Sequence, residues 1–151
     1  MKTAILYESY HHGNTKKICD AIRQKHEVTL IDARGGIEDL EKYDLIGIAS
    51  GAAYGKYYKT ITDVTRNKLP QNKKVFFIYT CGRPNRDYAA EVKKIASEKG
   101  CKILGVYGCK GYDTYGPLKL IGGINKENPS EDEINAAIKF YEDILRRCES
   151  D

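Results

Sequence analysis

The chain lacks the long apolar run that a membrane span needs, since none of its hydrophobic stretches approaches about 18 residues. The N-terminal stretch MKTAILYESYHH has too short an apolar core for a signal peptide, and no small-residue cleavage site follows it. No linker or low-complexity segment interrupts the 151 residues, of which 41% are hydrophobic and 30% charged. These features predict one folded cytoplasmic domain over residues 1–151, with no membrane span.

Positive charge is in only slight excess, since 25 Lys and Arg against 21 Asp and Glu give a net charge of +4. The pI near 8.7 lies below the value above about 9 that is typical of a dedicated nucleic-acid-binding domain. Basic residues also occur as separate pairs, and a solvated surface explains each pair except Lys16 and Lys17. We therefore expect no nucleic-acid partner.

The five cysteines are an odd number, with no CxxC motif and no histidine at metal-ligand spacing. This pattern is typical of buried or half-buried free thiols in a reducing compartment. We expect no structural zinc, no iron–sulfur cluster and no other metal site.

Five short β-like runs alternate with helical patterns, and three of the runs are continuously apolar, as in strands covered on both faces. The runs are Thr3–Tyr7, Val28–Ile31, Leu45–Ala49, Val75–Tyr79 and Ile103–Tyr107. Helical periodicity covers Thr15–His26, Lys56–Arg66, Asn85–Lys99 and a last helix up to Cys148, and 38–43 predicts a short helical turn. Gly100 predicts a left-handed helix stop, and Ser130 with Glu133 predicts a capping box.

Alternating strands and helices predict an α/β fold, a three-layer α/β/α sandwich around an open five-stranded parallel sheet. A closed eight-stranded barrel needs about 250 residues, more than the chain has. In open sheets the ligand lies beyond the carboxyl ends of the strands, where the strand order reverses. The loops that follow Tyr7, Ala49, Tyr79 and Tyr107 are therefore the candidate site.

The first of these loops runs from Glu8 to Thr15 and is followed by Lys16 and Lys17 in the first helical turn. Its Ser, Gly, Asn and Thr residues, placed at a helix N-terminus, are typical of an anion site. The motifs GxxxxGK[ST] and GxGxxG are both absent, so the loop is neither a nucleoside-triphosphate loop nor a dinucleotide fingerprint. An ordinary N-cap around Asn14 explains the same residues equally well.

Ser9-x-x-x-Gly13-Asn14-Thr15, directly after the first strand, resembles the phosphate loop of the flavodoxin family. Residues 50–56, SGAAYGK, resemble the family's loop that flanks the flavin ring, and residues 80–84, TCGRP, resemble the loop at its pyrimidine end. The three loops occur in the family's order and span nearly the whole chain. The resemblance implies a short-chain flavodoxin-like protein with FMN as cofactor and strand order 2-1-3-4-5.

The resemblance assigns individual residues to the two parts of FMN. Those implied for the phosphate are Ser9, Tyr10, His11, His12, Gly13, Asn14 and Thr15. Those implied for the ring are Ala53, Tyr54, Gly55, Thr80, Cys81, Gly82 and Arg83. The phosphate loop departs from the short-chain pattern Ser/Thr-x-Thr-Gly-x-Thr, because a His replaces the middle Thr and one extra residue precedes it.

Several of these residues have two interpretations. Tyr54 is a candidate for stacking on the flavin, and Gly55 or Gly51 for a peptide that reorients, whereas we expect Tyr57 to belong to a helix core. We expect Cys81 to be a small filler, while the Arg83 cation either lies near the ring or points into solvent. Tyrosines 112 and 115, in a segment expected to overhang the site, are candidates for covering the ring.

The resemblance implies an electron-transfer protein that carries single electrons between redox partner proteins, a reductase and an acceptor, and that acts as a monomer. The alternative is a small FMN-dependent NAD(P)H or quinone oxidoreductase. A third hypothesis is a flavin-free interaction domain, which the intact first loop disfavours. Flavodoxins are usually strongly acidic, so the net charge of +4 is a departure from the family pattern.

Overall fold

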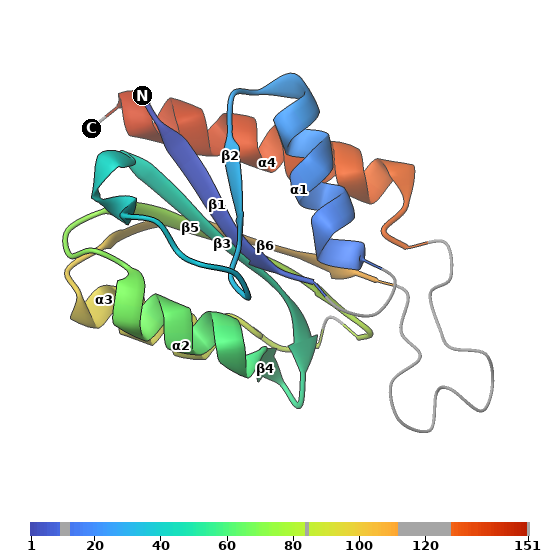
Figure 1. Cartoon of the computed structure of the whole chain (residues 1–151). Coiled ribbons are helices and arrows are strands. Elements are labelled where there is room, and N and C mark those ends of the chain that lie inside the picture. The colour runs from blue at the N-terminus through green and yellow to red at the C-terminus, as the bar shows by residue number, and fades with distance from the viewer. Residues whose placement is uncertain (10–12, 84, 112–127, 151) are drawn as a thin grey trace.

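The computed structural model describes residues 1–9, 13–83, 85–111 and 128–150 (Figure 1). In chain order the elements are β1 (Thr3–Glu8), α1 (Asn14–Lys25), β2 (Thr29–Asp32), the 3₁₀ helix η1 (Leu40–Lys42), β3 (Leu45–Ala53), β4 (Lys56–Tyr57), α2 (Lys59–Lys68), β5 (Lys74–Cys81), α3 (Ala90–Glu98), β6 (Lys102–Lys110) and α4 (Glu131–Glu149). The alternation of strands and helices predicted from the sequence is confirmed.

The sheet of the described chain has the order β2-β1-β3-β5-β6, with all these neighbours parallel and the short β4 pairing antiparallel to β3. Without β4 this is the predicted order 2-1-3-4-5. The register pairs Glu8 with Ser50, Gly51 with Thr80, and Thr80 with Cys109. The carboxyl ends of four strands therefore meet at one edge of the sheet.

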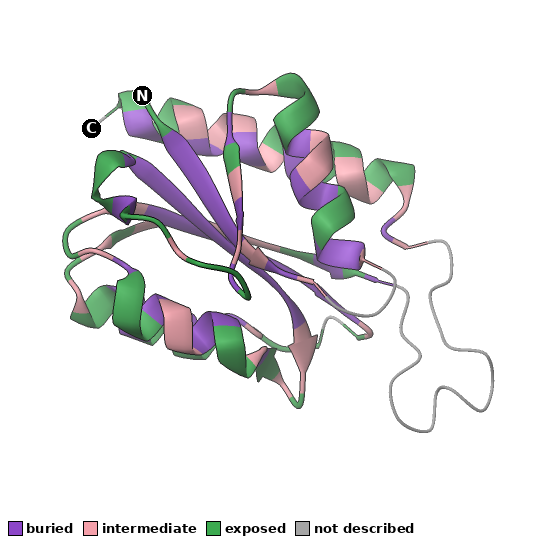
Figure 2. Ribbon diagram, in the orientation of Figure 1, coloured by how far each residue is buried: buried purple, intermediate pink, exposed green. Residues whose placement is uncertain are grey.

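Helices cover both faces of the sheet, α1 and α4 on one and α2 and α3 on the other (Figure 1). The side chains of each strand alternate between two cores because successive residues point to opposite faces. Phe76 and Ile78 pack with α1 and α4, and Phe77 packs with α2 and α3. Figure 2 shows the central strands as almost wholly buried. Each large apolar side chain buried in this way contributes about 1.5–3 kcal/mol.

Two predicted helix boundaries are confirmed in detail. The Ser130 hydroxyl accepts a hydrogen bond from the Glu133 N–H at 3.2 Å, and the Glu133 carboxylate accepts from the Ser130 N–H at 3.0 Å. This is the capping box predicted for the start of α4. After α3 the chain turns at Gly100, whose φ of +73° is the left-handed conformation that glycine adopts without steric cost.

Two other helix starts were predicted too early in the chain. The helix predicted over 56–66 begins at Lys59, because Lys56 and Tyr57 pair with the end of β3 as strand β4. Tyr57 is buried as predicted, but from a strand, and its hydroxyl donates to the Ile78 carbonyl at 2.7 Å. The helix predicted from Asn85 begins only at Ala90.

The structure also describes the state of the cysteines, the groups that could hold a metal and the helices that could cross a membrane. All five cysteines are free thiols, of which Cys101 is half-buried and the others are buried. In the described part of the chain, no group of three or more His, Cys, Asp or Glu side chains is placed to hold a metal ion. Within the same residues, no helix combines the length and apolar character needed to cross a membrane.

Candidate functional site

The described residues of the candidate site all lie at the carboxyl edge of the sheet. They come from the start of α1, the β3–β4 hairpin and the loop after β5: Ser9, Gly13, Asn14, Thr15, Ala53, Tyr54, Gly55, Thr80, Cys81, Gly82 and Arg83. Tyr10, His11, His12, Tyr112 and Tyr115 lie outside the described residues. Three loops far apart in the sequence therefore share one edge, because the strands before them are parallel neighbours.

The start of α1 has the features of an anion site. Gly13 precedes the helix in the left-handed conformation, with φ 65° and ψ 32°, and a Cβ at this position would meet no atom of the described residues within 4 Å. No acidic side chain lies in the first turn, and the Ser9 hydroxyl accepts a hydrogen bond from the Lys16 N–H at 3.3 Å. The first N–H groups of a helix and its dipole favour a negative charge at this end.

Buried contacts connect this helix start to the other strands. The hydroxyls of Thr15 and Thr80 lie 2.9 Å apart, and both residues are almost fully buried. Gly111 donates its N–H to the Cys81 carbonyl at 2.9 Å, and a Cβ at Gly111 would lie 2.5 Å from the Asn14 amide nitrogen. The ends of β5 and β6 thus hold the first turn of α1 in place.

The β3–β4 hairpin forms the second side of the edge. Its two turn residues, Tyr54 and Gly55, have φ values of 53° and 82°, as tight hairpin turns require. The Tyr54 side chain is 84% exposed, so the ring is accessible to a ligand or a partner. Gly51 has a different role from Gly55, because it lies within β3 and a Cβ there would lie 2.3 Å from the Tyr58 hydroxyl oxygen.

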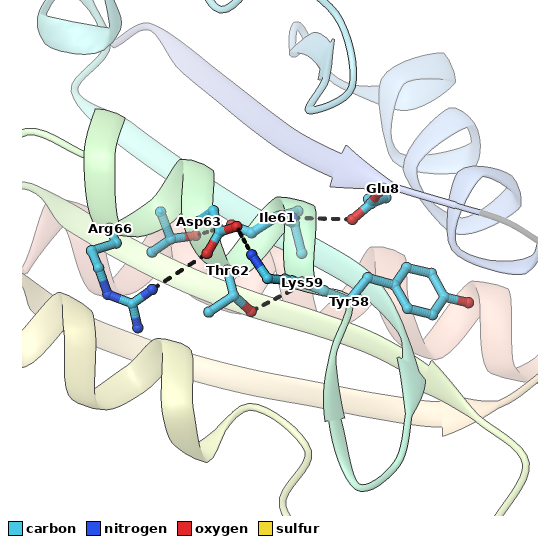
Figure 3. Close-up of polar contacts among 8 residues, drawn as sticks. Glu8, Tyr58, Lys59, Ile61, Thr62, Asp63 and Arg66 are labelled. Carbon is cyan, nitrogen blue, oxygen red and sulfur yellow. Dashed lines mark hydrogen bonds and ion pairs between the residues drawn. The ribbon is translucent and has the colours of Figure 1, made fainter.

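Sequence reasoning missed two residues that position the hairpin. Glu8 is fully buried at the end of β1, and its carboxylate accepts the Ile61 N–H at 3.0 Å in the first turn of α2 (Figure 3). The Ser50 hydroxyl accepts the Tyr58 N–H at 3.2 Å, directly before the same helix. Each residue directly follows a run predicted as a strand, and a polar residue at that position is the sequence signal that could have identified it.

The loop after β5 forms the third side. Cys81 is 5% exposed, and its thiol donates a weak hydrogen bond to the Cys109 carbonyl at 3.6 Å, which agrees with its predicted role as a filler. Burial raises the pKa of the neighbouring Cys109 thiol to about 12. The Arg83 side chain is exposed, and its carbonyl accepts the Tyr88 hydroxyl at 2.6 Å.

Arg86 was not predicted as a site residue, yet it contacts the hairpin. A Cβ at Gly55 would lie 2.8 Å from the Arg86 Nη1 atom, so the guanidinium lies against the hairpin tip. The Arg86 guanidinium therefore connects the loop after β5 to the β3–β4 hairpin. The helical periodicity predicted from Asn85 onward assigned Arg86 to a helix, whereas the structure places it in the loop before α3.

The arrangement fits a phosphate-bearing cofactor such as FMN. The open space beside Gly13, the absence of acidic side chains from the first turn of α1, and the hydroxyl and amide donors of Ser9, Asn14 and Thr15 suit a phosphate group. The exposed Tyr54 ring and the backbone of Gly82 lie on the two loops that would flank a planar ring.

Comparisons with known proteins agree with this geometry. The sequence model of a family described as "Flavodoxin domain" matches residues 4–117. The chain is 40% identical over 149 residues to "Uncharacterized protein MJ0298" of Methanocaldococcus jannaschii, covering 97% of this chain and 99% of that protein.

Solved structures share the fold along nearly the full length. Flavodoxin 1 from Bacillus cereus superposes with a TM-score of 0.67 at 17% identity, covering 97% of this chain and 98% of that one. The Fusobacterium nucleatum flavodoxin bound to flavin mononucleotide gives a TM-score of 0.64 at 14% identity, covering 95% and 98%. Since the family model matches more than half of the residues, the chain belongs to the flavodoxin family.

Proposed function

We propose that residues 1–151 form one domain that binds FMN and carries single electrons between a reductase and an acceptor protein. FMN is the cofactor that membership of the flavodoxin family indicates. The observation that carries the proposal is the start of α1, where a helix without acidic residues in its first turn opens beside Gly13 and is held by the Thr15–Thr80 contact. Bound FMN supplies the one-electron and two-electron redox chemistry of its ring.

The residues of the edge divide into two roles in this proposal. Those assigned to the phosphate are Ser9, Tyr10, His11, His12, Gly13, Asn14 and Thr15. Those assigned to the ring are Ala53, Tyr54 and Gly55 on one side and Thr80, Cys81, Gly82 and Arg83 on the other. The Thr15 and Thr80 hydroxyls connect the two groups, so the phosphate and the ring are positioned together.

The carrier is favoured over a small NAD(P)H or quinone oxidoreductase. This preference is supported by the fold, which superposes on flavodoxins of similar length along nearly the full length of both chains. We propose a monomer in a reducing cytoplasm, to which the five free thiols are suited.

A titration of the flavin-free protein with FMN and with riboflavin tests the proposal. FMN is expected to bind at least about tenfold more tightly, because charge-assisted hydrogen bonds to the phosphate contribute about 1.5–3 kcal/mol each. The double substitution Asn14→Ala and Thr15→Ala is expected to remove most of this difference. Thr60→Ala, an exposed threonine at the start of α2, is the matched control and is expected to change neither affinity.

Equal affinities for FMN and riboflavin contradict the assignment of residues 9–15. Anaerobic stepwise reduction of the FMN-loaded protein then separates the two functions. A carrier shows two separate one-electron steps and oxidises NAD(P)H slowly by itself. Rapid NAD(P)H oxidation in a single two-electron step contradicts the carrier.

A further inference from the structure

Five exposed cations border the candidate site. Each follows the carboxyl end of a strand, at the start of α1, in the β3–β4 hairpin, in the loop after β5 or at the end of β6. We call them the cationic rim: Lys17, Lys56, Arg83, Arg86 and Lys110. Their common position places positive charge around the edge where the flavin is proposed to bind.

The rim cations differ from other surface cations in their partners. Among the described residues, no ion pair involves any of the five rim side chains. Two cations at the same edge are paired one turn along their own helices, Lys16 with Asp20 at 2.7 Å and Lys59 with Asp63 at 2.6 Å. The rim charge is therefore not neutralised within the described chain.

Three described carboxylates on the elements that carry the rim, or in contact with them, have other partners. Glu8 is buried and accepts a backbone N–H of α2, while Asp87 pairs with a lysine of α3 at 2.5 Å. Glu133 accepts backbone N–H groups from Ser130 and from Lys110. The exposed carboxylates in the first turn of α4 lie on the face of the sheet covered by α1 and α4, opposite α2 and α3 (Figure 1). Among the described residues on the side of the hairpin and α3, no carboxylate forms an ion pair with a rim cation.

Arg86 contacts the hairpin at the residue directly before Lys56. The Arg86 guanidinium lies against Gly55, and the next residue along the chain is Lys56. Cations from two different loops therefore belong to one exposed surface, and an anionic surface that docks there is attracted to both.

We infer that the cationic rim is the docking surface for an acidic electron-transfer protein. This inference rests on the proposed function and adds the chemistry of the partner. Complementary charge steers the two proteins together and orients the partner's redox centre toward the hairpin. With FMN bound, the reduced centre of the pair would lose one electron and the oxidised centre would gain it, with no covalent bond formed or broken.

The test uses an acidic plant-type ferredoxin as the probe and basic cytochrome c as the opposite probe. Binding to the full-length protein is measured by calorimetry and by changes in amide NMR signals, both of which work without flavin. The ferredoxin is expected to bind, to perturb amides of the rim, and to bind about tenfold more weakly when ionic strength rises from about 0.02 to about 0.2 M. Preferential binding of cytochrome c, or an affinity independent of salt, overturns the inference.

Charge reversal locates the surface. The rim variant carries Lys56→Glu, Arg86→Glu and Lys110→Glu, and the control carries Lys25→Glu, Lys68→Glu and Lys94→Glu at exposed positions on α1, α2 and α3. Both lower the net charge by the same amount. The ferredoxin affinity is expected to fall at least about tenfold in the rim variant and about twofold in the control. Equal losses overturn the inference, because net charge alone then explains binding.

An FMN titration of both variants separates this inference from the proposed function. If neither the variants nor the unmodified chain binds FMN, the proposed function fails. If all bind FMN and the two variants bind ferredoxin equally, only the docking surface fails. The salt dependence of the unmodified chain still tests the surface if the rim variant does not fold.

Discussion

The two edges of the sheet use their polar groups differently. At the amino edge, polar groups bond to one another. The Lys2 N–H donates to the Asp44 carboxylate at 2.7 Å, and the Lys73 ammonium donates to the carbonyls of Glu41 and Tyr43 at 2.7 and 2.9 Å. These bonds connect the segments that precede β1, β3 and β5.

At the carboxyl edge, the internal bonds hold the loops but leave an open surface. The Thr15–Thr80 contact and the Glu8–Ile61 bond are buried beneath the loops. Above them, the Tyr54 ring and the cationic rim are exposed. In the described chain, polar groups of the amino edge are therefore paired with one another, while the carboxyl edge keeps exposed groups suited to binding, as expected where strand order reverses.

The largest effect is expected from Glu8→Ala. The substitution leaves the buried Ile61 N–H without its carboxylate acceptor, and a hydrogen bond to a charged group contributes about 1.5–3 kcal/mol. The free energy of unfolding is expected to fall by about 2–3 kcal/mol in a urea titration. FMN affinity is expected to fall as well, because the start of α2 follows the hairpin.

Glu8→Gln is the control, since its amide oxygen can still accept the Ile61 N–H. It is expected to cost less than about 1 kcal/mol. If Glu8→Ala destabilises the protein while FMN affinity is unchanged, the carboxylate stabilises the fold without positioning the carboxyl edge.

Much of the fold was predictable because both faces of the sheet are covered. Continuously apolar strands, the capping box of Ser130 and the stop at Gly100 are local signals, and the structure confirms each one. The hairpin was missed because Tyr57, Ile61 and Val64 have helical spacing, although Tyr57 lies in a strand. Periodicity does not distinguish a helix from a short strand that leads into one.

The candidate site was predictable as three loops but not as a set of contacts. The resemblance indicated the loops because their order along the chain is that of the family. The Glu8–Ile61 bond spans 53 positions and the Thr15–Thr80 contact spans 65, so no local pattern reveals them. Arg83 was singled out, but the cation that lies against the hairpin is Arg86, because the loop after β5 turns before α3 begins.

A smaller effect is expected from the buried hydroxyl pair of Thr15 and Thr80. Thr15→Val keeps the shape but removes one partner, and the free energy of unfolding is expected to fall by about 1–2 kcal/mol. The double substitution with Thr80→Val is expected to cost less than the sum of the two single ones. A coupling of about 1 kcal/mol in this cycle supports a direct bond, and additive losses contradict it.

Lys73→Met is the matched control from the amino edge. It removes two hydrogen bonds to carbonyls, one exposed and one half-buried, so a stability loss of about 1 kcal/mol is expected. FMN affinity is expected to stay unchanged in this variant and to fall in Thr15→Val. If both variants weaken FMN equally, the division between the two edges is wrong.

The smallest effect is expected from Glu133, whose carboxylate accepts the N–H of Lys110 at the end of β6. Burial by itself raises the pKa of this carboxyl, but hydrogen bonds from the Ser130 N–H, the Asn128 amide and the Lys110 N–H outweigh burial and bring the pKa below its ordinary value of 4.5. A depressed pKa stabilises the fold above the unfolded value, and this stabilisation is lost as pH falls through the folded pKa. Stability is therefore expected to decline below about pH 4.5.

Urea titrations across this pH range compare the unmodified chain with Glu133→Gln, which keeps an acceptor for the cap but does not titrate. The variant is expected to show a shallower loss of stability on acidification. The difference is expected to persist in high salt, because backbone N–H groups hold Glu133. Asp63 differs, since its lowered pKa comes from the exposed Lys59, which salt screens. Identical pH slopes for the two proteins contradict this account, because the hydrogen bonds to the Glu133 carboxylate would then contribute nothing to stability.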